Sequence, residues 1–256
     1  MPRLAIIGFG KMGRTIAQLA PERGFEVVGR IDPNGGDDSL ITRDSLHDAE
    51  VAVEFSTPTT APGNIMAAIE CGCPVVVGTT GWYAKRAEIE RAVTSRKGAL
   101  LIAPNFSIGV AAFSEIARAA ARALKSAPGF DAHITETHHT AKKDAPSGTA
   151  ASLEELTAAE WGKSIPITSI RVGAVPGTHE IVFDGPFEQI RLEHVARDRR
   201  VFADGALLAA KWLIGKTGIF SMSDVLGGST EAPAVPTSVP KEDLPQRKQG
   251  TRRHPR

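Results

Sequence analysis

The sequence predicts two structural parts: an α/β part with a parallel sheet, followed by an α+β part with a mostly antiparallel sheet. Two observations support this. In the first 107 residues, short apolar runs alternate with amphipathic segments of helix length, which is the pattern of successive β-α-β units. Between residues 169 and 195, three strand-like runs follow one another with no helix between them, which favours antiparallel pairing.

Composition sets the outer limits of function. The chain has 256 residues and a formal net charge of +1, so it is long enough for one large or two modest domains, and its charge gives no reason to expect nucleic acid or an anionic membrane as a partner. The two cysteines, Cys71 and Cys73, are too close in sequence to bridge easily, which fits a reducing compartment. No apolar run reaches transmembrane length and no signal peptide is evident, so we expect a cytoplasmic protein.

A dinucleotide-binding turn is predicted at the start of the chain. The apolar strand 4–7 runs directly into Gly8-Phe9-Gly10-Lys11-Met12-Gly13, a helical pattern follows, and the next strand, 25–31, ends at Asp32. Glycines let the backbone approach a pyrophosphate, and the helix start stabilises its charge. A carboxylate at the end of the second strand can accept from the adenosine ribose hydroxyls. The first part is therefore predicted to be a Rossmann-like dinucleotide-binding domain, with these seven residues in the cofactor site.

The choice between the two nicotinamide cofactors follows from charge. The Asp32 carboxylate would repel a 2′-phosphate, so NADH is the preferred cofactor. Lys11 and Arg30 lie close to it in sequence and could pair with that phosphate, so the use of NADPH stays open.

The alternation continues through predicted strands at 51–55, 74–77 and 99–103, with helices at 64–70 and 83–95 between them. Ligands of such sheets bind beyond the carboxyl ends of the strands. Two polar segments fall at that edge: Gly78-Thr79-Thr80, and Ala103-Pro104-Asn105-Phe106. Taken alone, each could equally be an ordinary turn between a strand and a helix.

The most informative segment runs from Glu136 to Ala150. A predicted strand at 130–137 ends in two histidines and two lysines within six residues, and Ser147 is a favoured N-cap for the helix that follows. An imidazole titrates near neutral pH, a lysine supplies a cation, and a helix start offers free N–H groups to a carboxylate. Paired histidines in a loop are more often plain polar surface, and without a cysteine or carboxylate at ligand spacing they do not indicate a metal site.

The same segment, E-x-H-H-x-x-K-x-D-A-P-S-G-T-A, resembles the signature of the 4-hydroxy-tetrahydrodipicolinate reductases of lysine and diaminopimelate biosynthesis. V-V-G-T-T-G and A-P-N-F-S resemble two further motifs of that family, and the resemblance covers about residues 3 to 227. It implies NAD(P)H-dependent reduction of a cyclic imine dicarboxylate, formed from 4-hydroxy-tetrahydrodipicolinate by loss of water. In that reaction a hydride adds at C4 and the protein delivers a proton to C3.

The resemblance also implies roles for individual residues. His138 would donate the proton, Lys142 would stabilise negative charge, and the substrate carboxylate would be held by His139, Gly148 and Thr149. The nicotinamide end of the cofactor would be lined by Gly78, Thr79, Thr80, Ala103, Pro104, Asn105 and Phe106. The family's second domain pairs its open sheet with other subunits, which implies a homotetramer.

We expect three divisions of the chain: a dinucleotide-binding domain (1–107 with 212–228), a substrate-binding and oligomerisation domain (108–211), and a tail (229–256). The tail is rich in Pro, Ser, Thr, Lys and Arg and is predicted to be disordered. Two other functions fit the two-domain plan: an amino-acid dehydrogenase, and a non-catalytic NAD(P)H-binding sensor. The dehydrogenase would not be expected to carry the H-H-x-x-K and P-S-G-T pieces together. The sensor would be expected to have lost the acid or the carboxylate cradle, and neither is lost here.

Overall fold

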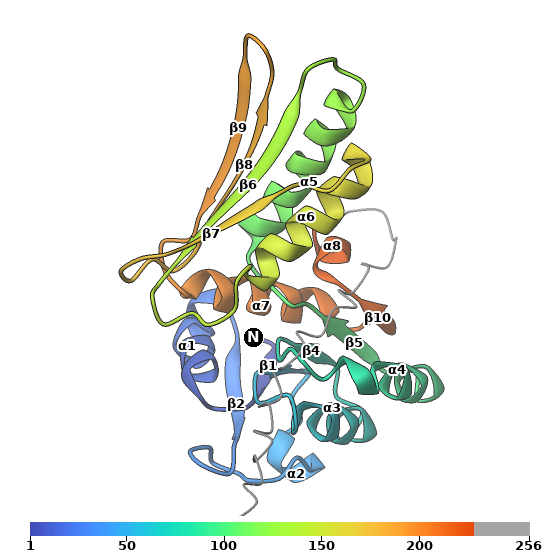
Figure 1. The fold of residues 1–256 in the computed structure, drawn as a ribbon. Coiled ribbons are helices and arrows are strands. Elements are labelled where there is room, and N and C mark those ends of the chain that lie inside the picture. Colours follow the sequence, from blue (N-terminus) through green and yellow to red (C-terminus); the bar gives the residue numbers. More distant parts are fainter. Residues whose placement is uncertain (228–256) are drawn as a thin grey trace, which may run out of the picture.

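The computed structural model describes residues 1–227; the tail predicted to be disordered lies outside the described residues. Six parallel strands form the first sheet, in the order β10-β5-β4-β3-β1-β2 (Figure 1). Their bounds are β1 (Arg3–Ile7), β2 (Glu26–Ile31), β3 (Val51–Glu54), β4 (Val75–Val77), β5 (Ala99–Ile102) and β10 (Gly218–Phe220). The chain passes from β1 to β2 on one side and then to β3 on the other, so the turns after β1 and β3 flank the point where the strand order reverses. That point is the usual ligand site of such sheets.

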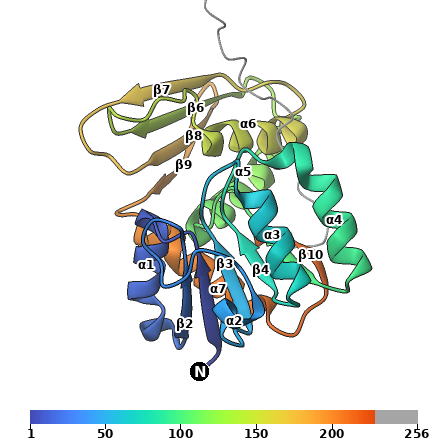
Figure 2. The same ribbon diagram turned by 90° about the horizontal axis from the view of Figure 1, so that it is seen from below.

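Helices cover both faces of this sheet, which confirms the predicted Rossmann-like domain (Figure 2). α1 (Lys11–Leu19) and α7 (Arg200–Leu213) pack on one face, and α3 (Ala61–Glu70) and α4 (Arg86–Ser95) pack on the other. Because both faces are covered, the apolar residues of the central strands are fully buried, as Val75 to Val77 illustrate. The short helical elements are η1 (Pro21–Arg23), α2 (Arg43–Leu46), η2 (Tyr83–Lys85) and α8 (Met222–Val225).

The second sheet is mixed, which corrects the prediction of a mostly antiparallel one. Its order is β7-β6-β8-β9, with β6 at Asp131–His138, β7 at Ile167–Arg171, β8 at Thr178–Asp184 and β9 at Gln189–Val195. β8 and β9 pair antiparallel with their neighbours, but β7 pairs parallel to β6. The cause is α6 (Gly148–Trp161), which lies between β6 and β7 in the chain and carries it back to the end of the sheet where β6 begins. The prediction compared only the strands that follow this helix.

Helices α5 (Ile108–Leu124) and α6 cover one face of the mixed sheet (Figure 1). Alternate residues of β6 point into this core, first Ala132 and Ile134 and then Glu136 and His138. The inward row therefore changes from apolar to polar and titratable along the strand. The predicted site residue His138 and its neighbour Glu136 thus occupy inward-facing positions of this strand.

The proposed division of the chain into domains stays a prediction. α7, most of which was assigned to the second domain, packs against β3 and β4 of the first sheet. Across the described residues, every helix is too short or too polar to span a bilayer.

Candidate active site

The turn between β1 and α1 has the geometry of a phosphate cradle. Gly8 has φ +88°, and a Cβ there would lie 2.2 Å from the carbonyl oxygen of Phe55. A Cβ on Gly13 would lie 2.2 Å from the carbonyl oxygen of Gly8, so only glycine fits at either position. α1 begins after Gly10 without a side-chain cap, which leaves its first N–H groups for an anion. The residues present therefore fit a dinucleotide pyrophosphate.

Asp32, a predicted cofactor-binding residue, lies against this turn. Its Oδ2 accepts from the Phe9 N–H at 2.7 Å and its Oδ1 accepts from the Asn34 N–H at 2.8 Å. Two arginines lie on the same side: the guanidinium carbons of Arg14 and Arg30 are 5.2 and 5.8 Å from the centre of the Phe9 ring. Arg14 was missed by the sequence analysis, although its place directly after the last glycine put it on the first turn of α1. A carboxylate and two cations therefore border the expected adenosine ribose.

Three predicted cofactor segments meet at Phe55, just after β3. A Cβ on Gly78 would lie 2.1 Å from the Phe55 ring, and the Phe106 and Phe55 ring centres are 5.6 Å apart. Thr79 is held there because its Oγ1 accepts from the Ser56 N–H at 2.7 Å. The structure thus joins the glycine turn to segments 78–80 and 103–106. Phe55, which the sequence analysis treated only as the end of a strand, is their common contact.

The signature segment begins at the carboxyl end of β6. His138 is buried, and its Nδ1 is hydrogen-bonded to the Oε2 of Glu136. Glu136 is itself completely buried, and its Oε1 accepts from Arg171 at 2.7 Å and from the Ser147 N–H at 3.3 Å. His179 of β8 meets the His138 ring edge-on, with ring centres 5.1 Å apart. The predicted proton donor is therefore held inside a polar cluster whose other members come from β6 itself, β7, β8 and the start of α6.

The loop after β6 carries two more predicted site residues, His139 and Lys142. The Lys142 ammonium lies 2.8 Å from an oxygen of Asp144. His139 points elsewhere, since its Nε2 lies 3.4 Å from the guanidinium of Arg199, just before α7. Lys142 thus stays within the signature segment, while His139 is turned toward the chain entering α7.

The start of α6, where an anion cradle was predicted, is capped by Ser147. The Ser147 hydroxyl accepts from the Ala150 N–H at 3.2 Å and is itself 3.2 Å from Nε2 of His179. Gly148 and Thr149 lie between Ser147 and Ala150, in the first turn of α6, where backbone N–H groups lack a helical partner. Asn105 donates to the Thr149 hydroxyl at 3.0 Å. This contact joins the predicted nicotinamide end of the cofactor site to the predicted carboxylate site.

The cluster has distinctive electrostatics. Burial lowers the pKa of His179 to about 4, and the neighbouring charge of His138 adds to the effect. Burial also lowers the pKa of His138, opposed by its hydrogen bond to Glu136. For Glu136, burial alone would raise the pKa, but hydrogen bonds from Arg171, Ser169 and His138 outweigh it and hold the carboxyl pKa below its ordinary value. Glu136 is therefore a buried anion at neutral pH.

Glu136, His138 and His179 each offer a ligand atom within 4.8 Å of the others, a spacing that a metal ion could use. Hydrogen bonds already occupy both carboxylate oxygens of Glu136 and one ring nitrogen of each histidine: Glu136 bonds to His138 Nδ1 and to Arg171, and His179 Nε2 lies within hydrogen-bond distance of Ser147. A guanidinium beside the carboxylate also opposes a second cation. We therefore interpret the three residues as a hydrogen-bonded cluster.

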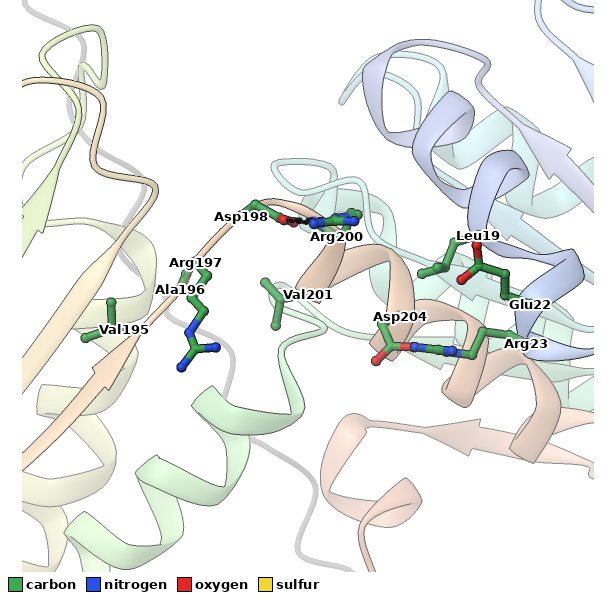
Figure 3. Close-up of a pocket in the computed structure, with 10 residues that line it drawn as sticks. All are labelled: Leu19, Glu22, Arg23, Val195, Ala196, Arg197, Asp198, Arg200, Val201 and Asp204. Atoms are coloured by element: carbon green, nitrogen blue, oxygen red, sulfur yellow. Dashed lines mark hydrogen bonds and ion pairs between the residues drawn. The ribbon is translucent and has the colours of Figure 1, made fainter.

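A small cavity of about 30 Å³ adjoins the cluster and is lined by His138, His179, Asn105 and Thr149, among others. A much larger and more open cavity, of about 670 Å³, lies elsewhere, between η1, the end of β9 and the start of α7 (Figure 3). Its charged side chains are largely paired with each other, as in Arg23 with Asp204 and Arg200 with Asp198. None of the predicted site residues lines this larger cavity, so its size does not mark the active site.

Comparison with known proteins agrees with this geometry. Residues 2–106 match the family model described as "Dihydrodipicolinate reductase, N-terminus", and residues 109–226 match "Dihydrodipicolinate reductase, C-terminus". The chain belongs to the dihydrodipicolinate reductase family. The N-terminal match implies that this member binds a nicotinamide cofactor.

Named relatives cover most of the chain. The 4-hydroxy-tetrahydrodipicolinate reductase of Christiangramia forsetii is 36% identical over 87% of this chain and 97% of that relative. The enzyme of the same name from Methanospirillum hungatei is 34% identical over 88% of this chain and 99% of that relative. Among solved structures, "Dipicolinate bound Dihydrodipicolinate reductase from Paenisporosarcina sp. TG-14" shares the fold, with a TM-score of 0.75, 24% identity and coverage of 86% of this chain and 97% of that one.

Proposed function

We propose that the protein reduces 4-hydroxy-tetrahydrodipicolinate to tetrahydrodipicolinate in lysine and diaminopimelate biosynthesis. The balanced reaction consumes the substrate, NAD(P)H and one proton, and yields tetrahydrodipicolinate, NAD(P)⁺ and water. The observation that carries the proposal is the 3.0 Å hydrogen bond from Asn105 to Thr149. It brings the cofactor edge of the first sheet against the anion cradle of α6, beside the buried His138. Family membership and the names of the relatives support the same reaction over an amino-acid dehydrogenase or a sensor.

In this proposal His138 is the proton donor. Its Nδ1 is engaged by Glu136, so Nε2 is the ring nitrogen free to deliver a proton to C3 of the substrate. Nε2 lies beside Gly177, where an added Cβ would be only 3.1 Å from it, so a larger residue at this position would crowd the imidazole. The reduced nicotinamide, when bound, supplies the hydride for C4.

The remaining residues hold the substrate and its charge. The N–H groups of Gly148 and Thr149 bind one substrate carboxylate at the start of α6. Lys142 stabilises the negative charge that develops as the ring is reduced. His139 completes the carboxylate site only if its side chain turns away from Arg199, to which it lies close at 3.4 Å.

For the cofactor, we propose that NADH is preferred and that NADPH is accepted. The Asp32 carboxylate, fixed by the Phe9 and Asn34 N–H groups, favours free ribose hydroxyls. Arg14 and Arg30 beside Phe9 provide positive charge for a 2′-phosphate. Arg30 is partly neutralised by Asp37 at 3.2 Å, which leaves Arg14 as the stronger candidate.

The test follows nicotinamide absorbance while the full chain meets freshly made 4-hydroxy-tetrahydrodipicolinate, with NADH and NADPH in separate reactions. We expect oxidation of both, with the larger kcat/KM for NADH. A larger value for NADPH would show that the arginines outweigh Asp32. If the protein binds NADH but oxidises neither cofactor, the reductase proposal is wrong, and the sensor or amino-acid dehydrogenase takes its place.

A further inference from the structure

The pair formed by the buried Glu136 and the partly buried Arg171 is not explained by substrate or cofactor binding. Glu136 lies two residues before His138 on the same face of β6 and has no exposed surface. In the register of β6 and β7, Arg171 is the direct partner of His138, which explains why its guanidinium reaches the same carboxylate. Burying an ion pair costs desolvation, and an apolar pair of similar volume would often be as stable. Stability alone therefore does not account for this pair.

The hydrogen bonds of Glu136 connect three parts of the site. One oxygen accepts from the His138 ring, and the other accepts from Arg171 and from the Ser147 N–H, which directly precedes the carboxylate cradle of α6. A carboxylate can only accept, so the neutral His138 ring must carry its proton on Nδ1. The proton needed for donation then enters and leaves at Nε2, on the cavity side.

We propose that Glu136 is a positioning residue for the proton donor: anchored by Arg171 and by the Ser147 N–H, it fixes the ring orientation and tautomer of His138. This inference rests on the proposed reductase function for its kinetic consequences. The same carboxylate ties the proton donor to the start of α6. The imidazole and the substrate carboxylate site consequently keep a fixed distance.

The charges around His138 determine how its pKa should change when one of its neighbours is replaced. Glu136 on its own strand favours the imidazolium, while burial, Lys142 of the following loop and Arg171 of β7 oppose it. His179 of β8 faces the ring edge-on and is held neutral by its own low pKa. Removing the Glu136 charge should therefore lower the pKa of His138, and removing the Arg171 charge should raise it.

The kinetic test compares pH profiles of kcat/KM for Glu136→Gln and Arg171→Gln in the full chain. A general acid must be protonated, so activity falls as pH rises through the pKa of His138. We expect this fall to move to lower pH in Glu136→Gln, with a loss of kcat/KM on the order of 10²-fold at neutral pH, and to higher pH in Arg171→Gln. Glu160→Gln is the control, because Glu160 is likewise paired with arginine, here with Arg118 and Arg122, and lies away from the site. Its profile should be unchanged.

A second measurement does not depend on turnover. With ¹⁵N-labelled histidine, the His138 signal, assigned by its loss in His138→Gln, should report the Nδ1–H tautomer in the unmodified chain and a shift toward Nε2–H in Glu136→Gln. If the chain shows this signal but no reductase activity, the proposed function fails while the positioning role stands. An unchanged tautomer, or profiles that move in the same direction in both variants, would overturn the positioning role. If Glu136→Gln does not fold, two results still test the positioning role. A shift of the Arg171→Gln profile to higher pH together with an Nδ1–H tautomer in the unmodified chain supports it, and the opposite of either result overturns it.

Discussion

At the scale of single residues, replacing His138 is the most direct test of the proposed mechanism. His138→Gln removes the proton donor but keeps a polar side chain of similar size, so we expect kcat to fall by roughly a hundred- to ten-thousandfold with little change in KM. Steady-state kinetics measures this, and NADH binding by fluorescence, expected to be unchanged, shows that the variant is folded. Activity equal to that of the unmodified chain would remove His138 from the mechanism.

Two adjacent lysines allow a matched comparison of charge at the site. Lys142 is partly buried and 2.8 Å from Asp144, whereas Lys143 is exposed. If Lys142 stabilises charge in the transition state, Lys142→Met should lower kcat on the order of 10²-fold. Lys143→Met should leave kcat within about twofold, because an exposed charge is screened by solvent. Equal losses in both variants would point to a general effect of positive potential instead of a specific role for Lys142.

At the scale of elements, the close contact of α7 with segment 103–106 is the most sensitive feature. A Cβ on Gly205 of α7 would lie 1.7 Å from the carbonyl oxygen of Phe106, a backbone atom that cannot move without shifting the cofactor edge. Gly205→Ala should therefore destabilise the protein by about 1–3 kcal/mol and raise the KM for NADH. Gly63→Ala in α3 is the control, because a Cβ there meets nothing within 4 Å.

In that control, the gain in helix propensity should stabilise the chain by about 0.5–1 kcal/mol. Thermal or urea unfolding of both variants measures the change in the free energy of unfolding, which should be a decrease for Gly205→Ala and an increase for Gly63→Ala. A Gly205→Ala protein as stable as the unmodified chain would mean that α7 and Phe106 can separate at no cost.

The same scale shows what could be predicted from the sequence. Runs such as Val75–Val77 and the glycine turn after β1 are local signals, and the structure confirms the parallel sheet that they predict. The prediction of a mostly antiparallel second sheet missed the parallel pairing of β7 with β6, because a strand's alternation looks the same in parallel and antiparallel pairing. Only the helix between β6 and β7 determines it.

The site residues likewise fall into two groups: those that a local motif identifies, and those that only tertiary contacts bring together. His138, Lys142 and the Ser147 cap lie within one short segment, so a motif could identify them together. Glu136 and Arg171 are 35 positions apart, and their contact depends on the register of β7. Phe55 is likewise a partner only because three turns converge on it. Such contacts are tertiary, and a single sequence carries no local signal for them.

At the scale of the whole molecule, the mixed sheet has one face that no described helix covers (Figure 1). This outer face carries polar and apolar side chains, including the ion pair of Glu180 and Arg191 at 2.8 Å, with Val195 half exposed. An open sheet of this kind is commonly covered by another subunit, and we propose that this face forms the interface of a homotetramer. Its alternating polar rows suit a wet, isologous interface better than a fully apolar one.

The proposed tetramer interface can be tested by introducing an arginine on the outer face of the mixed sheet and, as a control, another beside the first sheet. Val182 lies in the middle of β8, between His133 of β6 and Arg191 of β9, so Val182→Arg would place a second arginine at the centre of the outer face. Light scattering should give about four times the chain mass for the unmodified protein and a smaller species for Val182→Arg. Leu40→Arg adds the same charge at an exposed apolar position beside the first sheet and should leave the mass unchanged. A monomer for the unmodified chain would contradict the tetramer; a tetramer that survives Val182→Arg would place the interface on another face, because an unpaired arginine at a subunit interface is costly to bury.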